Sequence, residues 1–274
     1  MEMLKQAYDL LVSEYQQCRR IVAENEHLLL YANEKDRHSL QVAGAGNYLL
    51  CHINEFKNAS AEKLNIVKTA VLLHDIGRFA EIKHLLNNQH GYDHGVQGAK
   101  FLQKIPLFNN IKIWLPIKHH GHLIEDLYQD ELYLGISDKS LQEEIKHICF
   151  VIRDADKIAN LNMLTREENI WPLFFGTDTY CPQTDGVISP AVYRQAFMDM
   201  TIRREDRKTA ADFCVSYIAW LKDINYRAAI DYCNKLNILP RLHRVLDLYC
   251  SDTQFKQEYM AHIKKYVKEH QFLD

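Results

Sequence analysis

A histidine and an aspartate stand side by side at His74-Asp75, where the apolar run Val71-Leu72-Leu73 ends. Because an imidazole and a carboxylate both lose hydration against a core, such a pair is seldom placed there without a partner. Further histidines and one more carboxylate are spaced along the chain at intervals of a helix length: His38, His94, His119, His120 and Asp156. Imidazoles and carboxylates gathered from several helices are the ligands that a hard or borderline divalent metal ion needs. The pattern predicts a metal-dependent enzyme.

Asp156 tests this interpretation best. On the helix predicted over residues 138–164, Ile148 and Ile152 belong to an apolar stripe, and Asp156 continues the stripe at i+4. A carboxylate on the inward face must be paired or bind a metal ion. The alternative is an ion pair with an internal lysine or arginine. Asp154 is rotated away from the stripe, which predicts an exposed position or one outside the ligand set.

The other histidines are weaker signals when taken singly. His38 begins the inward face that continues through Val42, and Glu34 lies one turn before it, so both side chains could face one ion. A lone histidine on an apolar face is usually a hydrogen-bonded core residue. The same alternative applies to His94 and to His119-His120. Together, however, the order H…HD…H…HH…D is far more specific than any one member.

The residues resemble a known family. His38, His74-Asp75 within HDIGR, and Asp156 within DADKIAN resemble the signature of the HD-domain superfamily of metal-dependent phosphohydrolases. The resemblance covers roughly residues 30 to 165. It implies an all-helical bundle whose central helices direct histidine and aspartate side chains at one or two divalent metal ions.

The resemblance also implies roles for individual residues. The implied core metal ligands are His38, His74, Asp75 and Asp156. Asp75 would bridge two ions, and His94 with His119 or His120 would complete the second position, as in the two-metal branches of the superfamily. Glu34 matches an additional acidic ligand of some cyclic-dinucleotide members. The implied cofactor is one or two divalent ions, and Mn, Fe, Co, Ni, Mg and Zn all remain open.

The chain also departs from named branches. Cyclic-di-GMP phosphodiesterases follow the double histidine with Glu and a GYP motif, whereas this chain has Gly121-His122-Leu123 and no GYP. Alarmone hydrolases carry an acidic pair shortly after HD, where this chain has Gly77-Arg78-Phe79. Asn160 follows Asp156 at the D-xxx-N spacing of those hydrolases, which predicts a contact between Asn160 and substrate.

Cationic groups are needed near a phosphate to offset its charge in the transition state. Arg78 is the first candidate, acting beside Asp75 in catalysis and in substrate binding. Lys157 and Lys118, next to predicted ligands, are weaker candidates, and a solvated surface position is the favoured interpretation of Lys118. Two residues of a later basic cluster, Arg204 and Lys208, are predicted to grip a substrate phosphate, although most charge runs are exposed faces.

Composition narrows the class of protein. The chain has 274 residues, 47% of them hydrophobic, and a formal net charge of −3, so no global charge draws it to nucleic acid or to an anionic membrane. Ten glycines and six prolines argue against a turn-rich β fold. Seven cysteines without a CxxC are typical of reduced thiols in a cytoplasmic protein. No signal-peptide order and no apolar run of membrane-spanning length is found.

Helical periodicity predicts an all-α fold. We expect an N-terminal helix packing on the core in residues 1–30, a metal-binding HD core in 31–165, and a C-terminal helical extension in 166–274, together forming one compact domain. The aromatic segment 171–190 is predicted to be a covering loop. Helices are expected over about 2–31, 36–56, 61–75, 94–104, 138–164, 190–201, 207–222, 225–236, 240–249 and 253–270.

Three functions fit these observations. The leading one is a metal-dependent phosphohydrolase of a small nucleotide or other phosphoester. The second is an HD-type di-iron oxygenase, because histidine-rich two-metal sites also suit iron. The third is a non-catalytic nucleotide sensor that retains its metal site. The amphipathic terminal helices are also compatible with a homodimer.

Overall fold

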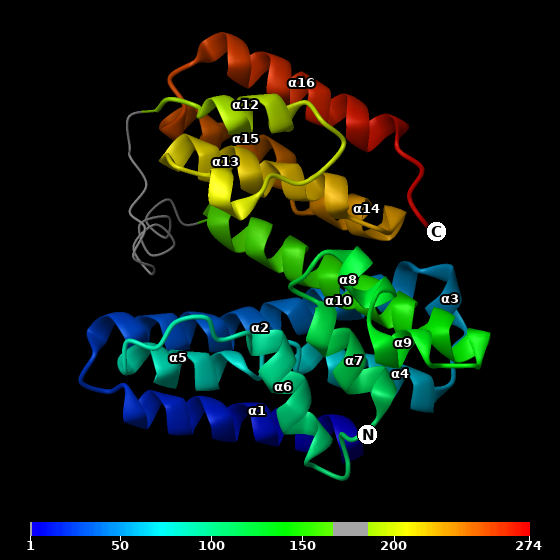
Figure 1. Cartoon of the computed structure of the whole chain (residues 1–274). Coiled ribbons are helices and arrows are strands. Elements are labelled where there is room, and N and C mark those ends of the chain that lie inside the picture. Colours follow the sequence, from blue (N-terminus) through cyan, green and yellow to red (C-terminus); the bar gives the residue numbers. More distant parts are fainter. Residues whose placement is uncertain (1, 167–185) are drawn as a thin grey trace. The chain divides into compact units, whose positions relative to one another are not determined.

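The computed structural model describes residues 2–166 and 186–274 (Figure 1). Every regular element in these ranges is a helix, and the few residues in isolated bridges, such as Tyr226 and Leu273, form no strand. The predicted all-α class is therefore confirmed. Most of the aromatic segment 171–190, predicted as a covering loop, lies outside the described residues. None of the described helices is both long enough and apolar enough to cross a membrane.

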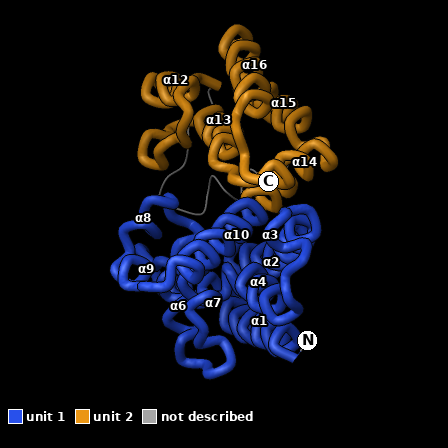
Figure 2. Tube along the Cα trace, turned by 90° about the vertical axis from the view of Figure 1, so that its right-hand side faces the viewer, with its two compact units in different colours: residues 1–156 blue, residues 157–274 orange. Residues whose placement is uncertain are grey.

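The chain divides into two compact units, residues 1–156 and 157–274 (Figure 2), and each is described by itself. The sequence-based division after residues 30 and 165 stays a prediction. The helices that lie in the first unit or begin in it are α1 (Glu2–Ile21), α2 (Glu26–His52), α3 (Asn54–Lys57), α4 (Ala61–Leu72), α5 (Arg78–Leu86), α6 (His94–Gln103), α7 (Ile111–His119), α8 (Ile124–Tyr128), α9 (Glu131–Leu134) and α10 (Lys139–Arg166).

Local capping explains where several of these helices begin. The single helix expected over residues 2–31 is wrong, because Asn25 accepts a hydrogen bond from the Leu28 amide and starts α2 there. Two other helices begin at a side-chain cap: Ser60 accepts a hydrogen bond from the Lys63 amide, and Asp93 accepts one from the Val96 amide. Asp93 thereby fixes the start of α6, the helix that His94 begins.

The core of the first unit is built where α2, α4 and α7 pack together, with α1 against α2 and α4. Helices α2 and α4 approach closely, because a Cβ placed on Gly46 would lie 2.6 Å from Val71 Cγ1. Helix α6 packs on α7 (Figure 1). A Cβ on Gly95 would lie 2.8 Å from the Lys118 carbonyl oxygen, so these two helices meet main chain to main chain.

The second unit contains the last turns of α10 and a series of shorter helices: α12 (Pro190–Ala196), η2 (Arg204–Asp206), α13 (Ala210–Ala219), η3 (Trp220–Asp223), α14 (Arg227–Lys235), α15 (Ile238–Tyr249) and α16 (Thr253–Glu269). Pro190 occupies the first turn of α12, where the missing amide hydrogen costs no helical hydrogen bond. The buried carboxylate of Asp212 accepts hydrogen bonds from the amide and hydroxyl of Ser189 and from the amides of Lys208 and Thr209. Asp212 thus fastens the segment before α12 to α13.

Candidate metal centre

Five segments of the first unit bring the predicted ligands to one place. His38 lies in the middle of α2, and His74-Asp75 follow the end of α4. His94 is the first residue of α6, His120 directly follows α7, and Asp156 lies on α10. Histidine and aspartate side chains that are far apart in the sequence therefore share one interior region, as the order of the motif predicts.

The first donor group consists of His38, His74 and Asp75, with one ligand atom from each within 4.8 Å of the others. All three residues are buried. Asp156 extends the group, because its Oδ1 lies 2.8 Å from His38 Nε2 and 3.8 Å from His74 Nε2. His74 Nε2 also lies 3.8 Å from Asp75 Oδ2. Two imidazole nitrogens and two carboxylates thus converge.

The second donor group consists of Asp75, His94 and His120. Asp75 Oδ1 lies 3.2 Å from His94 Nε2 and 3.4 Å from His120 Nε2, and the two imidazole nitrogens are 3.3 Å apart. Asp75 therefore belongs to both groups, with Oδ2 toward His74 and Oδ1 toward His94 and His120. A carboxylate with one oxygen in each of two donor groups is placed to bridge two cations.

Hydrogen bonds orient two of the imidazole rings. His74 Nδ1 donates to the Val71 carbonyl oxygen at 3.0 Å, and His120 Nδ1 donates to the Ile117 carbonyl oxygen at 2.7 Å. In each ring this contact puts the proton on Nδ1 and leaves the Nε2 lone pair for a metal ion. Within the described residues, His74 Nε2 is buried without a hydrogen-bond partner. An orphaned buried acceptor of this kind fits a metal ligand.

The protonation states also suit a cation. Burial lowers the pKa of His74 to about 4 and that of His94 to about 3, so both imidazoles are neutral near pH 7. Burial by itself raises the pKa of Asp75, but the charges of Lys35 and Arg78 hold it well below its usual range. The pKa of Asp156 is also lowered: burial raises it, and the hydrogen bond from His38 outweighs that effect. His74 and His94 therefore offer neutral nitrogens, and Asp75 and Asp156 offer ionised oxygens.

Two cationic side chains flank the shared carboxylate. Lys35 Nζ lies 3.4 Å from Asp75 Oδ2, and Arg78 Nε lies 3.4 Å from Asp75 Oδ1. Arg78 also pairs with Glu81 at 2.6 Å. Lys35 was not among the predicted residues. The sequence does contain one indication of Lys35: it precedes His38 by three residues on the same helix, so the two side chains lie on the same face, one turn apart.

The comparison with protein families gives one match. Residues 36–161 match the family model described as the HD domain. These residues form an HD domain. The matched range contains every member of both donor groups, so the resemblance inferred from His38, His74-Asp75 and Asp156 is confirmed at the level of the family. Comparison with curated proteins and with solved structures gave no significant match.

HD domains bind divalent metal ions, and HD-domain proteins are in general hydrolases. The donor atoms described above fit such an ion, because they combine imidazole nitrogens with carboxylate oxygens at ligand spacing. The residues that would hold one ion are His38, His74, Asp75 and Asp156, and those that would hold a second are Asp75, His94 and His120.

Two predicted ligands of the HD domain have other partners in the structure. His119 Nε2 lies 2.7 Å from Asp130 Oδ2, and Lys118 pairs with the same carboxylate. Of the adjacent histidines, the second donor group thus contains His120. Glu34 belongs to neither group and pairs with Arg37 at 2.6 Å.

Two buried residues of α10, Arg153 and Asp154, lie outside the apolar stripe from which the buried face of this helix was predicted. Asp154 is fully buried and belongs to neither donor group, so of its two expected positions the exposed one is wrong and the one outside the ligand set agrees with the structure. Residues 151–155 are all buried, because this part of α10 is enclosed on nearly every side. Arg153 is buried as well, and its guanidinium donates to the main-chain carbonyls of His120 and His122. It thereby holds the turn that carries His120.

The remaining predicted substrate contacts lie in the second unit. Lys157 Nζ pairs with Asp223 at 3.0 Å. Asn160 lies on α10, and Arg204 lies in η2, where its carbonyl accepts a hydrogen bond from Arg207. The Lys208 amide donates to Asp212. The roles of these four residues in substrate binding stay predictions.

Proposed function

We propose that this chain is a metal-dependent phosphohydrolase that cleaves a phosphomonoester or phosphodiester bond of a small nucleotide-like substrate with metal-activated water. One observation carries the proposal: the two oxygens of Asp75 face two separate groups of histidines, with Lys35 and Arg78 beside them. A pair of divalent ions bound there would supply a water of lowered pKa and polarise a phosphoryl oxygen.

The side chains of the centre would perform the remaining tasks. Buried hydrogen bonds from His74 and His120 to main-chain carbonyls fix the ring orientations before substrate arrives. Arg78 and Lys35 neutralise Asp75 in the structure described here. With divalent ions bound beside Asp75, Lys35 and Arg78, which also pairs with Glu81, would no longer be needed to neutralise this carboxylate and would stabilise the charge of a substrate phosphate in the transition state. This gives Lys35 the same role as Arg78.

The test is hydrolysis of a panel of nucleotides and generic phosphodiesters with Mn²⁺, Co²⁺, Ni²⁺ or Mg²⁺, together with metal counting per chain. We expect turnover with at least one ion. Asp75→Ala should abolish both metal loading and turnover while leaving the helical circular dichroism unchanged. His52→Gln is the matched control: His52 stacks on Tyr48 at the end of α2, outside both donor groups, so it should behave as the wild type.

The outcomes separate the proposal from its alternatives. A fully metal-loaded chain that leaves the whole panel intact would contradict hydrolysis and favour the nucleotide-sensor alternative. Protein purified anaerobically with two irons, a di-iron Mössbauer signature and oxygen consumption would favour the oxygenase alternative. Full turnover by Asp75→Ala would show that the bridging carboxylate is misassigned.

A further inference from the structure

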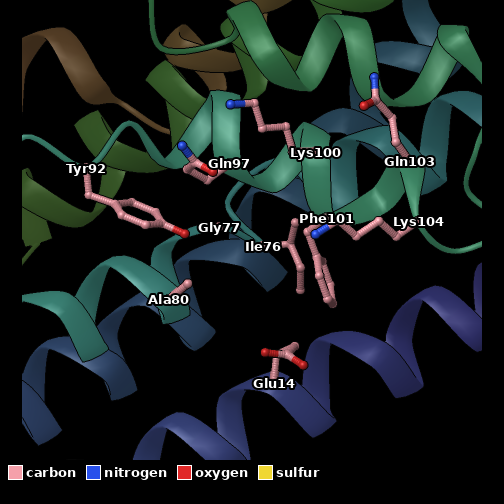
Figure 3. A pocket seen from close by; sticks show the side chains of 10 residues that line it. All are labelled: Glu14, Ile76, Gly77, Ala80, Tyr92, Gln97, Lys100, Phe101, Gln103 and Lys104. Atoms are coloured by element: carbon pink, nitrogen blue, oxygen red, sulfur yellow. The ribbon is translucent and has the colours of Figure 1, made fainter.

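A pocket of about 450 Å³ lies in the first unit, bordered by the residues that follow His74-Asp75 (Figure 3). Small-molecule sites occupy about 300–1,000 Å³, so the volume suits a ligand of modest size. Ile76, Gly77 and Ala80 line one side, and the opposite side belongs to α6. No member of the two donor groups lines this pocket, so it is distinct from the metal centre.

The charge of the lining favours an anion. Lys100 lies in the last turn of α6 and Lys104 is the residue that caps its C-terminal end, and neither pairs with a carboxylate in the part of the chain that the structure describes. The lining contains one acidic residue, Glu14, whose carboxylate lies 3.7 Å from the ammonium group of Lys83. The pocket lining therefore carries two positive charges and one negative charge, and the negative charge is already partly neutralised by Lys83. An anionic group is the complement of such a lining.

The remaining lining favours a flat apolar group. The Phe101 ring comes from α6 and the Tyr92 ring from the segment before it, with Ile76 and Ala80 across the pocket. In Figure 3 the Lys104 side chain extends toward Phe101 and Ile76, so a positive charge lies next to apolar surface. Apolar walls with a few placed polar groups are typical of sites for small organic ligands.

The pocket touches the two segments that carry Asp75 and His94. Gly77 follows Asp75 by two residues, and α6 begins at His94. These segments are in main-chain contact, because a Cβ on Gly77 would lie 2.1 Å from the His94 carbonyl oxygen. Helix α6 is also in main-chain contact with α7 at Gly95, where a Cβ would lie 2.8 Å from the Lys118 carbonyl oxygen, and α7 leads directly into His120. A ligand that binds both walls therefore restrains the segments that carry the second donor group.

We propose that this pocket is a second ligand site that takes a small organic anion with a flat apolar part, and that its occupancy strengthens divalent-ion binding by Asp75, His94 and His120. A ligand that contacts both the Ile76–Ala80 segment and α6 restricts the motion of these two segments relative to each other. Without the ligand, binding of the metal ion would have to restrict the same motion at a cost in entropy. Linkage makes the effect reciprocal, so the metal ion should strengthen binding of the anion by the same factor.

The test uses the full chain and naphthalene-2-sulfonate as the probe, followed by its fluorescence, with 2-naphthalenemethanol as the neutral analogue. We expect one binding site for the sulfonate, with binding weakened about tenfold in the double variant Lys100→Met/Lys104→Met. Ala80→Phe, which fills the pocket without changing charge, should abolish binding. The matched control Lys5→Met/Lys57→Met removes two exposed lysines of the same unit and should bind as the wild type.

Calorimetric titration with Mn²⁺ then measures the link. A saturating concentration of the sulfonate should raise the affinity of the weaker Mn²⁺ position about fivefold, and the effect should vanish in the two pocket variants. Equal binding of the sulfonate by the double variant, or equal binding of the neutral analogue, overturns the anion site. An unchanged Mn²⁺ affinity overturns the link. Neither readout uses turnover, so a failure of phosphohydrolase activity is distinguished from a failure of this inference.

Discussion

Gly77 gives a sharp test of how main-chain packing holds the second donor group together. It has φ −71° and ψ −14°, a conformation that alanine adopts without strain. A Cβ there would nevertheless lie 2.1 Å from the His94 carbonyl oxygen and 2.9 Å from the Gly98 amide nitrogen. Both atoms belong to the main chain of α6, so no side-chain rotation relieves the overlap. In Gly77→Ala the helix must move.

The size of the effect follows from this contact. Cβ atoms essentially never approach other heavy atoms within 3.0 Å, so the 2.1 Å contact must open by about 0.9 Å. Overpacking costs about 1–3 kcal/mol, and a clash with rigid main chain belongs at the upper end. We expect the free energy of unfolding to fall by about 3 kcal/mol. Because His94 Nε2 lies only 3.2 Å from Asp75 Oδ1, the same movement should weaken the second metal position.

Urea unfolding followed by circular dichroism measures the stability, and equilibrium dialysis against Mn²⁺ counts the ions. Gly44→Ala is the control, because no atom lies within 4 Å of a Cβ at this position in α2. Alanine in a helix interior should stabilise the fold by about 1 kcal/mol and leave the ion count unchanged. Wild-type stability together with an undiminished Mn²⁺ complement in Gly77→Ala would refute the reasoning.

Three further predictions concern single side chains. His94→Ala should reduce the ion count from two per chain to one, because His94 belongs only to the second donor group; metal analysis of the purified variant checks this, and an unchanged count would assign His94 a structural role. Arg78→Ala should depress turnover more than metal content, since Arg78 flanks Asp75 without being a donor to a cation; an equal fall in both would make it structural. Burial lowers the pKa of Lys222 from 10.5 to about 8, so between these pH values this lysine binds more protons in the unfolded chain, and its own contribution to the stability of the fold should rise with pH. Lys222→Met should flatten that rise in urea unfolding measured from pH 8 to 10.5, and an identical pH slope in both proteins would count against the assignment.

The convergence of the residues in the candidate metal centre was largely predictable, because these residue types are costly to bury. His38, His74-Asp75 and Asp156 stand on apolar faces, where an unpaired polar group is rarely tolerated. The choice between His119 and His120 was not predictable in this way. Adjacent residues of a helix point about 100° apart, and the partner of His119 is Asp130, which another helix's cap supplies.

Other features depended on tertiary structure that residue patterns do not encode. Lys35 looks like an ordinary surface lysine until Asp75 is placed 3.4 Å from its ammonium group. Asp154 lies off the apolar stripe of α10, but the helix is enclosed there, so the stripe did not mark the only buried face. The end of α1 lacks glycine and proline, and only the capping Asn25 marks the start of the next helix.

The main-chain contacts of α6 have a consequence for metal selectivity. Carbonyl and amide atoms, at Gly77 on one side and Gly95 on the other, determine how far His94 stands from its fellow donors. Substitutions in the aliphatic core should therefore change the melting temperature but leave the relative affinities for cations of different radius unchanged. Substitution of one of these glycines would therefore be a direct way to alter the ionic preference, with backbone spacing as the adjustable quantity.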